Sequence, residues 1–146
     1  MTRRHYSVAE VEALIPTLEQ VFTQVIQLRA GLRGIEQQLE RAGASVDTDE
    51  DAAESESPEV RKARAVFRGY YEALSDGLER IRAVGGDVKD LDLGLVDFPG
   101  LRDDEEILLC WRLGEKRIEY WHTVDSGFAG RRRLDERVTR TPSRLD

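Results

Sequence analysis

The chain has 146 residues and a formal net charge of −7, and this length is sufficient for one domain with a hydrophobic core. Its single cysteine excludes an internal disulfide framework, and no apolar run reaches the length of a membrane-spanning helix. Because charged residues follow Met1 almost directly, we expect no signal peptide and predict a cytoplasmic protein with no membrane contact.

The first predicted element is a long helix that begins near Val8. Ser7 and Glu10 have the spacing of a capping box, in which each side chain satisfies a free amide at the start of a helix. Pro16 removes one backbone hydrogen bond, so we expect a kink or a short first helix near residues 14–16. A second apolar strip flanks only the first half of the helix, which predicts wider burial there. The main strip has the period of a coiled-coil seam and consists of Leu14, Leu18, Val21, Val25, Leu28, Leu32, Ile35 and Leu39.

A second helix is predicted after an acidic segment. Residues 43–57 are polar and acidic, and we interpret them as a loop rather than a metal-binding cluster. Ser57 and Pro58 are residue types favoured at the cap and at the first position of a helix, and Gly85 with Gly86 would end it. The two helices predict an antiparallel, coiled-coil-like hairpin over residues 7–85.

Residues 87–124 change to β-prone runs separated by turn signals, and they predict a small sheet of three antiparallel strands. We expect the second hairpin to turn at Glu115 and Lys116. This turn would pair Cys110 with Trp121 and Leu109 with His122, and it would place Arg112 opposite Glu119. In the first hairpin we expect Phe98 opposite Ile107.

The predicted register sorts the side chains onto two faces, because neighbouring residues of a strand point to opposite sides. It places Cys110 and His122 on opposite sides, which argues against a metal site or a nucleophile–base pair built from them. His122, Asp97 and Cys110 therefore stay weak metal candidates, and no cofactor is predicted. The face expected to cover the first helix carries Val96, Phe98, Ile107, Leu109, Trp111, Leu113, Ile118, Tyr120 and His122. The other face carries Leu95, Asp97, Leu108, Cys110, Arg112, Glu119, Trp121 and Thr123.

This second, mixed face is the candidate functional surface. Its polar side chains stand beside rigid aromatic residues, which favours either a subunit contact or a concave ligand site. Residues 131–146 are rich in arginine and are expected to form a flexible basic tail. The candidate ligand-binding residues are Asp97, Arg112, Glu119 and Trp121 from the sheet, with His122, Asp125 and Arg131 from its edge.

Three motifs, "VKDLDLGLVDFP", "LCWRLGE" and "YWHTVDSGFAGR", resemble the bacterial family catalogued as domain of unknown function 2203. The resemblance extends from "YSVAEVEALIP" to Arg131. It implies an identity but no activity, substrate or cofactor. Lys116 stands where the family often has proline, and Arg132 and Arg133 stand where it often has Gln-Pro.

These features predict an α+β fold, mainly helical, with one domain over residues 1–130. Our leading interpretation is a non-enzymatic interaction or scaffold protein that dimerises through the helical hairpin, because two helices alone cannot enclose both apolar stripes. A second interpretation is a protein, possibly an enzyme, that binds a small molecule, an anion or a metal on the sheet. A third is nucleic-acid binding through the arginine-rich tail, which an acidic loop elsewhere in the chain argues against.

Overall fold

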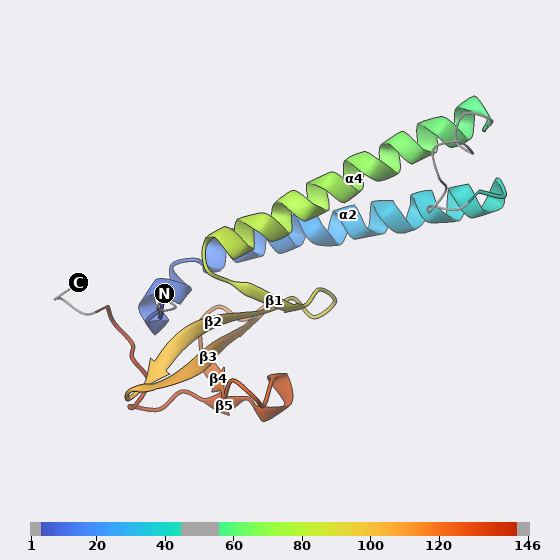
Figure 1. Ribbon diagram of the computed structural model, residues 1–146. Coiled ribbons are helices and arrows are strands. Elements are labelled where there is room, and N and C mark those ends of the chain that lie inside the picture. The colour runs from blue at the N-terminus through green and yellow to red at the C-terminus, as the bar shows by residue number, and fades with distance from the viewer. Residues whose placement is uncertain (1–3, 45–55, 143–146) are drawn as a thin grey trace. The chain divides into compact units, whose positions relative to one another are not determined.

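The computed structural model describes residues 4–44 and 56–142 and has the predicted α+β class. The chain divides into two compact units, which are described separately below. Unit 1 comprises Met1–Phe22 and Arg80–Asp146, and unit 2 comprises Thr23–Glu79. In the described part of the chain, no helix is long and apolar enough to cross a membrane. The elements are α1 (Val8–Glu12), α2 (Ile15–Arg41), α4 (Pro58–Ala83), β1 (Asp87–Asp90), β2 (Leu95–Arg102), β3 (Glu105–Arg112), β4 (Tyr120–His122), the 3-10 helix η1 (Phe128–Gly130) and β5 (Arg132–Arg133) (Figure 1).

The helix start and its early break follow the sequence prediction. The Ser7 side chain accepts a hydrogen bond from the Glu10 amide at 3.2 Å, and the Glu10 carboxylate accepts one from the Ser7 amide at 3.0 Å. α1 then ends at Glu12 and α2 begins at Ile15. Pro16 therefore lies in the first turn of α2, where its missing amide hydrogen would have no helical partner. The described helical region thus consists of the short helix α1 and the two long helices α2 and α4.

The sheet of unit 1 has five antiparallel strands in the order β1-β2-β3-β4-β5, so the prediction of three strands was wrong (Figure 1). The additional strands are β1, at the start of the β-prone region, and β5, which lies in the predicted basic tail. Both are short and polar, with sequences DVKD and RR. Neither shows the apolar alternation that marks a half-buried strand.

The observed strand pairing differs from the predicted one in both hairpins. In the first hairpin Phe98 pairs with Leu109, a shift of two residues that leaves every side chain on its predicted face. In the second hairpin Cys110 pairs with Tyr120, and Leu108 pairs with His122. This shift is one residue, and it moves all β4 side chains to the opposite face of the sheet.

The connection between β3 and β4 explains the one-residue error. It spans residues 113–119 and does not form the tight turn that we predicted. The Trp111 Nε1 donates a hydrogen bond to the Glu115 carbonyl oxygen at 2.9 Å, and the Ile118 amide donates one to the Glu12 carboxylate at 3.2 Å. These contacts, one of them from α1, fix the path of the loop and so the register of β4.

One face of the sheet forms the apolar core of unit 1. Phe98 packs edge-on against Tyr6 with ring centroids 5.6 Å apart, and the centroids of Trp111 and Phe22 lie 5.9 Å apart. Gly86 permits close packing, because a Cβ there would lie 2.8 Å from side-chain atoms of Ile81 and Val96. The predicted packing of this face on the start of the helical region is therefore confirmed for β2 and β3. The buried apolar residues of unit 1 include Val8, Val11, Leu18, Phe22, Ile81, Val96, Phe98, Leu109 and Trp111.

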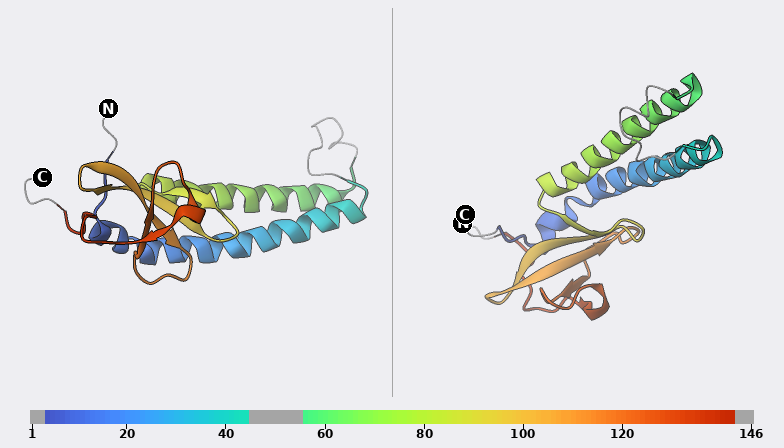
Figure 2. Two further views of the ribbon diagram at one scale, coloured as in Figure 1. Left: turned by 90° about the horizontal axis from the view of Figure 1, so that it is seen from below. Right: turned by 45° about the vertical axis from the view of Figure 1, so that its right-hand side comes forward.

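The segment between β4 and β5 covers the other face of the sheet. In Figure 2 the segment with η1 lies on the side of the sheet opposite α1. Residues 131–142, which we expected in a flexible tail, are held in unit 1. The Val8 amide donates to the Thr139 carbonyl at 3.1 Å, Val138 is buried, and Arg102 forms a bidentate ion pair with Asp135. Residues 143–146 lie outside the described part.

Unit 2 contains most of α2 and α4, which run antiparallel and side by side (Figures 1 and 2). A buried cluster of Leu39, Val60 and Ala63 joins their distal ends. Gly31 lets the Tyr70 ring lie on the helix backbone, because a Cβ there would be 3.0 Å from the ring. The predicted cap is present, since Ser57 Oγ accepts a hydrogen bond from the Val60 amide at 3.3 Å. Most of the predicted acidic loop 43–57 lies outside the described residues.

Candidate metal centre

Three side chains able to ligate a metal converge on the face of the sheet that residues after β4 cover. They are Asp97 from β2, Cys110 from β3 and His122 from β4. One potential ligand atom of each residue lies within 4.8 Å of those of the other two. Each residue is only 2% exposed. Since Asp97 pairs with Cys110 and His122 with Leu108, all three side chains point to the same face.

His122 is oriented by hydrogen bonds at both ring nitrogens. Its Nδ1 lies 2.8 Å from the Thr123 carbonyl oxygen, and its Nε2 lies 3.0 and 3.1 Å from the two Asp97 carboxylate oxygens. A carbonyl oxygen only accepts hydrogen bonds, so Nδ1 carries a hydrogen and donates it. A backbone carbonyl on Nδ1 with Nε2 facing inward is the usual orientation of a metal-ligating histidine.

Cys110 is a buried thiol with an acidic neighbour. Burial raises its pKa to about 11, and the nearby charge of Asp97 acts in the same direction. The Arg131 guanidinium opposes this shift but does not cancel it. At neutral pH the thiol is therefore protonated unless a metal ion displaces its proton.

Arg131 closes the site from the segment that follows η1. Its Nε donates to Cys110 Sγ at 3.3 Å, and its Nη2 lies 3.1 Å from the Cys110 carbonyl oxygen and 2.6 Å from Glu115 Oε1. The guanidinium also lies 4.1 Å from the centroid of the Tyr120 ring. Glu115 Oε1 accepts a second hydrogen bond, from the Arg112 amide at 2.6 Å. Arg131 is thus a fixed positive charge beside the sulfur.

The arrangement differs from that of a cysteine nucleophile with a histidine base. Such a pair needs the imidazole between the thiol and its orienting carboxylate. Here both ring nitrogens of His122 are already engaged, by Asp97 and by Thr123. Together with the burial of Cys110, this makes coordination of a metal ion the chemistry that the geometry supports best.

Comparison with known proteins places the chain in a family. Residues 4–134 match the model of an uncharacterized conserved protein family, DUF2203. The chain belongs to this family. The resemblance seen in the sequence motifs is therefore confirmed, and the matched range of this DUF2203 chain includes Asp97, Cys110 and His122. No curated protein and no solved structure matches the chain.

The structure corrects the separation of Cys110 from His122. We predicted them on opposite faces, yet both lie on one face with Asp97, because β4 is displaced by one residue. The same displacement moves Trp121 to the apolar face. There the Arg102 and Arg132 guanidinium groups lie 5.0 and 5.6 Å from its ring centroid.

The remaining candidate residues divide between this candidate site and the surface. Arg131 lies at the site, as described above. Arg112 is exposed at the end of β3, and the contacts it makes with Glu115 involve its backbone amide and carbonyl groups. Glu119 is exposed in the loop before β4, and Asp125 is exposed in the turn before η1. The seven predicted ligand residues therefore do not form a single cluster.

Two residues of the site were missed by sequence reasoning. We interpreted Glu115 as a turn residue, and we placed Tyr120 in the platform under the helices. Glu115 orients Arg131 through an ion pair in which the side chains are 20% and 14% exposed, respectively. A charged residue beside Gly114 is typical of an ordinary turn, so no local signal distinguished Glu115.

Proposed function

We propose that the protein binds one divalent transition-metal ion through Asp97, Cys110 and His122. The main support for this proposal is that three different types of metal ligand converge on one buried face, with ligand atoms within 4.8 Å of one another. A mixed set of carboxylate oxygen, thiolate sulfur and imidazole nitrogen favours zinc or a similar borderline metal over magnesium or calcium, which prefer oxygen ligands.

The residues around the three ligands support this proposal. The Thr123 carbonyl fixes the imidazole so that Nε2 faces the other two ligand atoms. Arg131 supplies a positive charge beside the sulfur, which favours the thiolate required for coordination. Three protein ligands leave one position of a tetrahedral ion for water or an exogenous ligand.

Cobalt titration of chelator-treated protein tests the proposal. Because Cys110 is the only cysteine of the chain, a thiolate-to-cobalt charge-transfer band can arise from no other residue. We expect this band to saturate at one cobalt per chain and to disappear in Cys110→Ala. We also expect metal analysis to find zinc near one per chain after growth with zinc, and much less in Asp97→Asn.

A matched control exists for the histidine. The chain has two histidines, and His5 is partly exposed and bonded to Glu106 at 2.7 Å, away from the three ligands. His5→Ala should keep the cobalt band, whereas His122→Ala should weaken or abolish it. Circular dichroism would show that each variant is folded. Folded wild-type protein that shows no thiolate–cobalt band and no stoichiometric zinc would contradict the proposal.

We also propose that unit 2 pairs with a second copy of the chain, which would make the protein a homodimeric interaction module. Its described surface carries the exposed apolar residues Ile26, Val66 and Tyr71, which are 52%, 38% and 56% exposed. Burial of such side chains in a four-helix arrangement would be favourable. Light scattering at micromolar concentration should give twice the chain mass. Tyr71→Glu should shift the protein toward monomer, and a monomeric wild-type protein would overturn this second proposal.

A further inference from the structure

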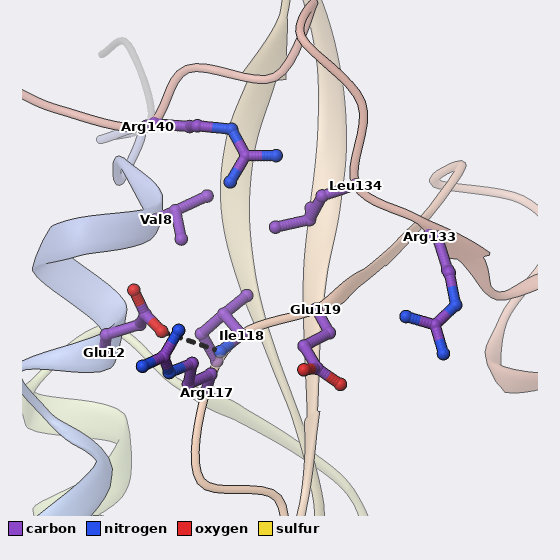
Figure 3. Close-up of a pocket in the computed structure, with 8 residues that line it drawn as sticks. All are labelled: Val8, Glu12, Arg117, Ile118, Glu119, Arg133, Leu134 and Arg140. Carbon is purple, nitrogen blue, oxygen red and sulfur yellow. Dashed lines mark hydrogen bonds between the residues drawn. The ribbon is translucent and has the colours of Figure 1, made fainter.

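A separate pocket of unit 1 is lined by arginine, glutamate and apolar side chains. It has a volume of about 320 Å³ and lies between α1, the loop before β4 and the chain after β5 (Figure 3). This volume is at the lower end of the range for small-molecule sites. Its lining residues are Val8, Glu12, Arg117, Ile118, Glu119, Arg133, Leu134 and Arg140.

Three apolar side chains contribute to the wall of the pocket, whose exposed surface is otherwise mostly polar. Val8 and Ile118 are each 3% exposed, and Leu134 is half-buried. In Figure 3 the three side chains lie around one space, with Val8 on α1 opposite Leu134. The backbone beneath them is fixed, because the Leu134 amide donates to the Glu119 carbonyl at 2.9 Å and the Ile118 amide donates to Glu12. A short hydrocarbon group could therefore rest on the exposed part of Leu134 and the edges of Val8 and Ile118 without rearrangement of the backbone.

The positive charges of the pocket lack carboxylate partners within the described residues. Arg117, Arg133 and Arg140 form no ion pair there. By contrast, Arg131 and Arg137, from the same C-terminal segment, pair with Glu115 and Asp103. Three guanidinium groups and two carboxylates leave the lining with one net positive charge.

The three arginines occupy different positions around the pocket. The Arg140 guanidinium extends over the pocket above Val8 and toward Leu134, whereas Arg117 approaches from the opposite side near Glu12 (Figure 3). Arg133 stands at the rim, with its guanidinium directed away from Val8. Arg140 is thus the group best placed to meet an anion whose body rests on the apolar wall. A guanidinium can bind both oxygens of a carboxylate at once.

We propose that this pocket binds a small organic carboxylate, with its carboxylate on Arg140 and its apolar body against Val8, Ile118 and Leu134. This site does not depend on the metal centre. Glu12 and Glu119 on the opposite side disfavour a second negative charge on the ligand, so the expected ligand is a monoanion.

Calorimetric titration of the full chain at low salt with hexanoate tests the proposal. We expect saturable binding that weakens as salt increases. Hexanol has the same body without the charge, and acetate has the charge with almost no body. Each should bind about tenfold more weakly or worse, because each loses one of the two recognition elements.

Substitution of Arg140 provides the residue-level test. Arg140→Gln should lower the affinity for hexanoate about tenfold or more. Arg132→Gln, a control at an exposed arginine outside the pocket, should leave this affinity unchanged. The Ala9 amide bonds to the backbone carbonyl of Arg140, and the substitution keeps this bond. Unchanged hexanoate affinity in Arg140→Gln, or inorganic phosphate bound as tightly as hexanoate, would overturn the proposal.

Discussion

The two faces of the sheet are buried to the same extent but by different means. On the face toward α1, Phe98 and Trp111 are fully buried and pack against aromatic rings. On the opposite face, here called the polar face, Asp97 and His122 are each 2% exposed, and their polar atoms form hydrogen bonds with each other. Adjacent residues of one strand serve the two faces, since Asp97 lies between Val96 and Phe98. Burial alone therefore does not distinguish the two faces. Only the chemistry of the side chains shows which face carries the candidate site.

The largest loss of folding stability is expected from a substitution on the apolar face, the face toward α1. Trp111→Ala should lower the free energy of unfolding by about 3–5 kcal/mol, because it leaves a large cavity beside Phe22. It also removes the Nε1 hydrogen bond that holds the loop before β4. Urea unfolding followed by circular dichroism measures the change. A loss below about 1 kcal/mol would mean that this face contributes far less than its burial indicates.

A smaller loss of folding stability is expected when the hydrogen bonds between Asp97 and His122 on the polar face are removed. Asp97→Ala leaves the buried His122 Nε2 without its partner and should cost about 3 kcal/mol in metal-free protein. Asp97→Asn can still donate a hydrogen bond to Nε2 and should cost less. The same urea experiment in the presence of a chelator compares the two variants. Equal losses would show that the hydrogen bond does not stabilise the fold.

Substitutions on the two faces should differ in their effect on stabilisation by a metal ion. A ligand that binds only the folded state at 100 times its dissociation constant stabilises that state by about 2.7 kcal/mol. Zinc should give such a gain to the wild type and to a mild apolar-face variant such as Val96→Ala, but not to Asp97→Ala. Unfolding curves with and without zinc provide the measurement. A gain retained in Asp97→Ala would place the metal elsewhere.

The helices and the apolar face could be predicted from the sequence because both depend on local periodicity. The capping box at Ser7 and Glu10 and the alternation around Phe98 are short-range patterns, and the structure has both. A register error of two residues in β2 did not matter, because the side chains of a strand repeat every two residues.

The candidate site could not be predicted because it depends on contacts between distant residues. Whether His122 faces Cys110 is decided by a single residue of register in β4. That register is set where Glu12 binds the Ile118 amide and where the Trp111 indole binds Glu115. The opposite-charge pair Arg112 and Glu119 favoured the wrong alignment, since a surface pair of this kind contributes little energy.

The smallest and most local effect concerns the reactivity of Cys110. Burial, reinforced by Asp97, raises its pKa from 9.0 to about 11, so below pH 9 its thiolate fraction should be about 100-fold lower than that of an unperturbed thiol. The folded, metal-free protein should therefore react with iodoacetamide far more slowly than the denatured chain. The difference should narrow as the pH rises from 9 to 11, because the unfolded thiol is already ionised there while the folded one still titrates. For the same reason, the part of the folding stability linked to this thiol is complete below pH 9 and decreases toward pH 11. Since the chain has no second cysteine, the measured rate belongs to Cys110 alone. Equal rates in the folded and denatured states at pH 8 would show that the polar face is open to solvent, unlike the apolar face across the sheet.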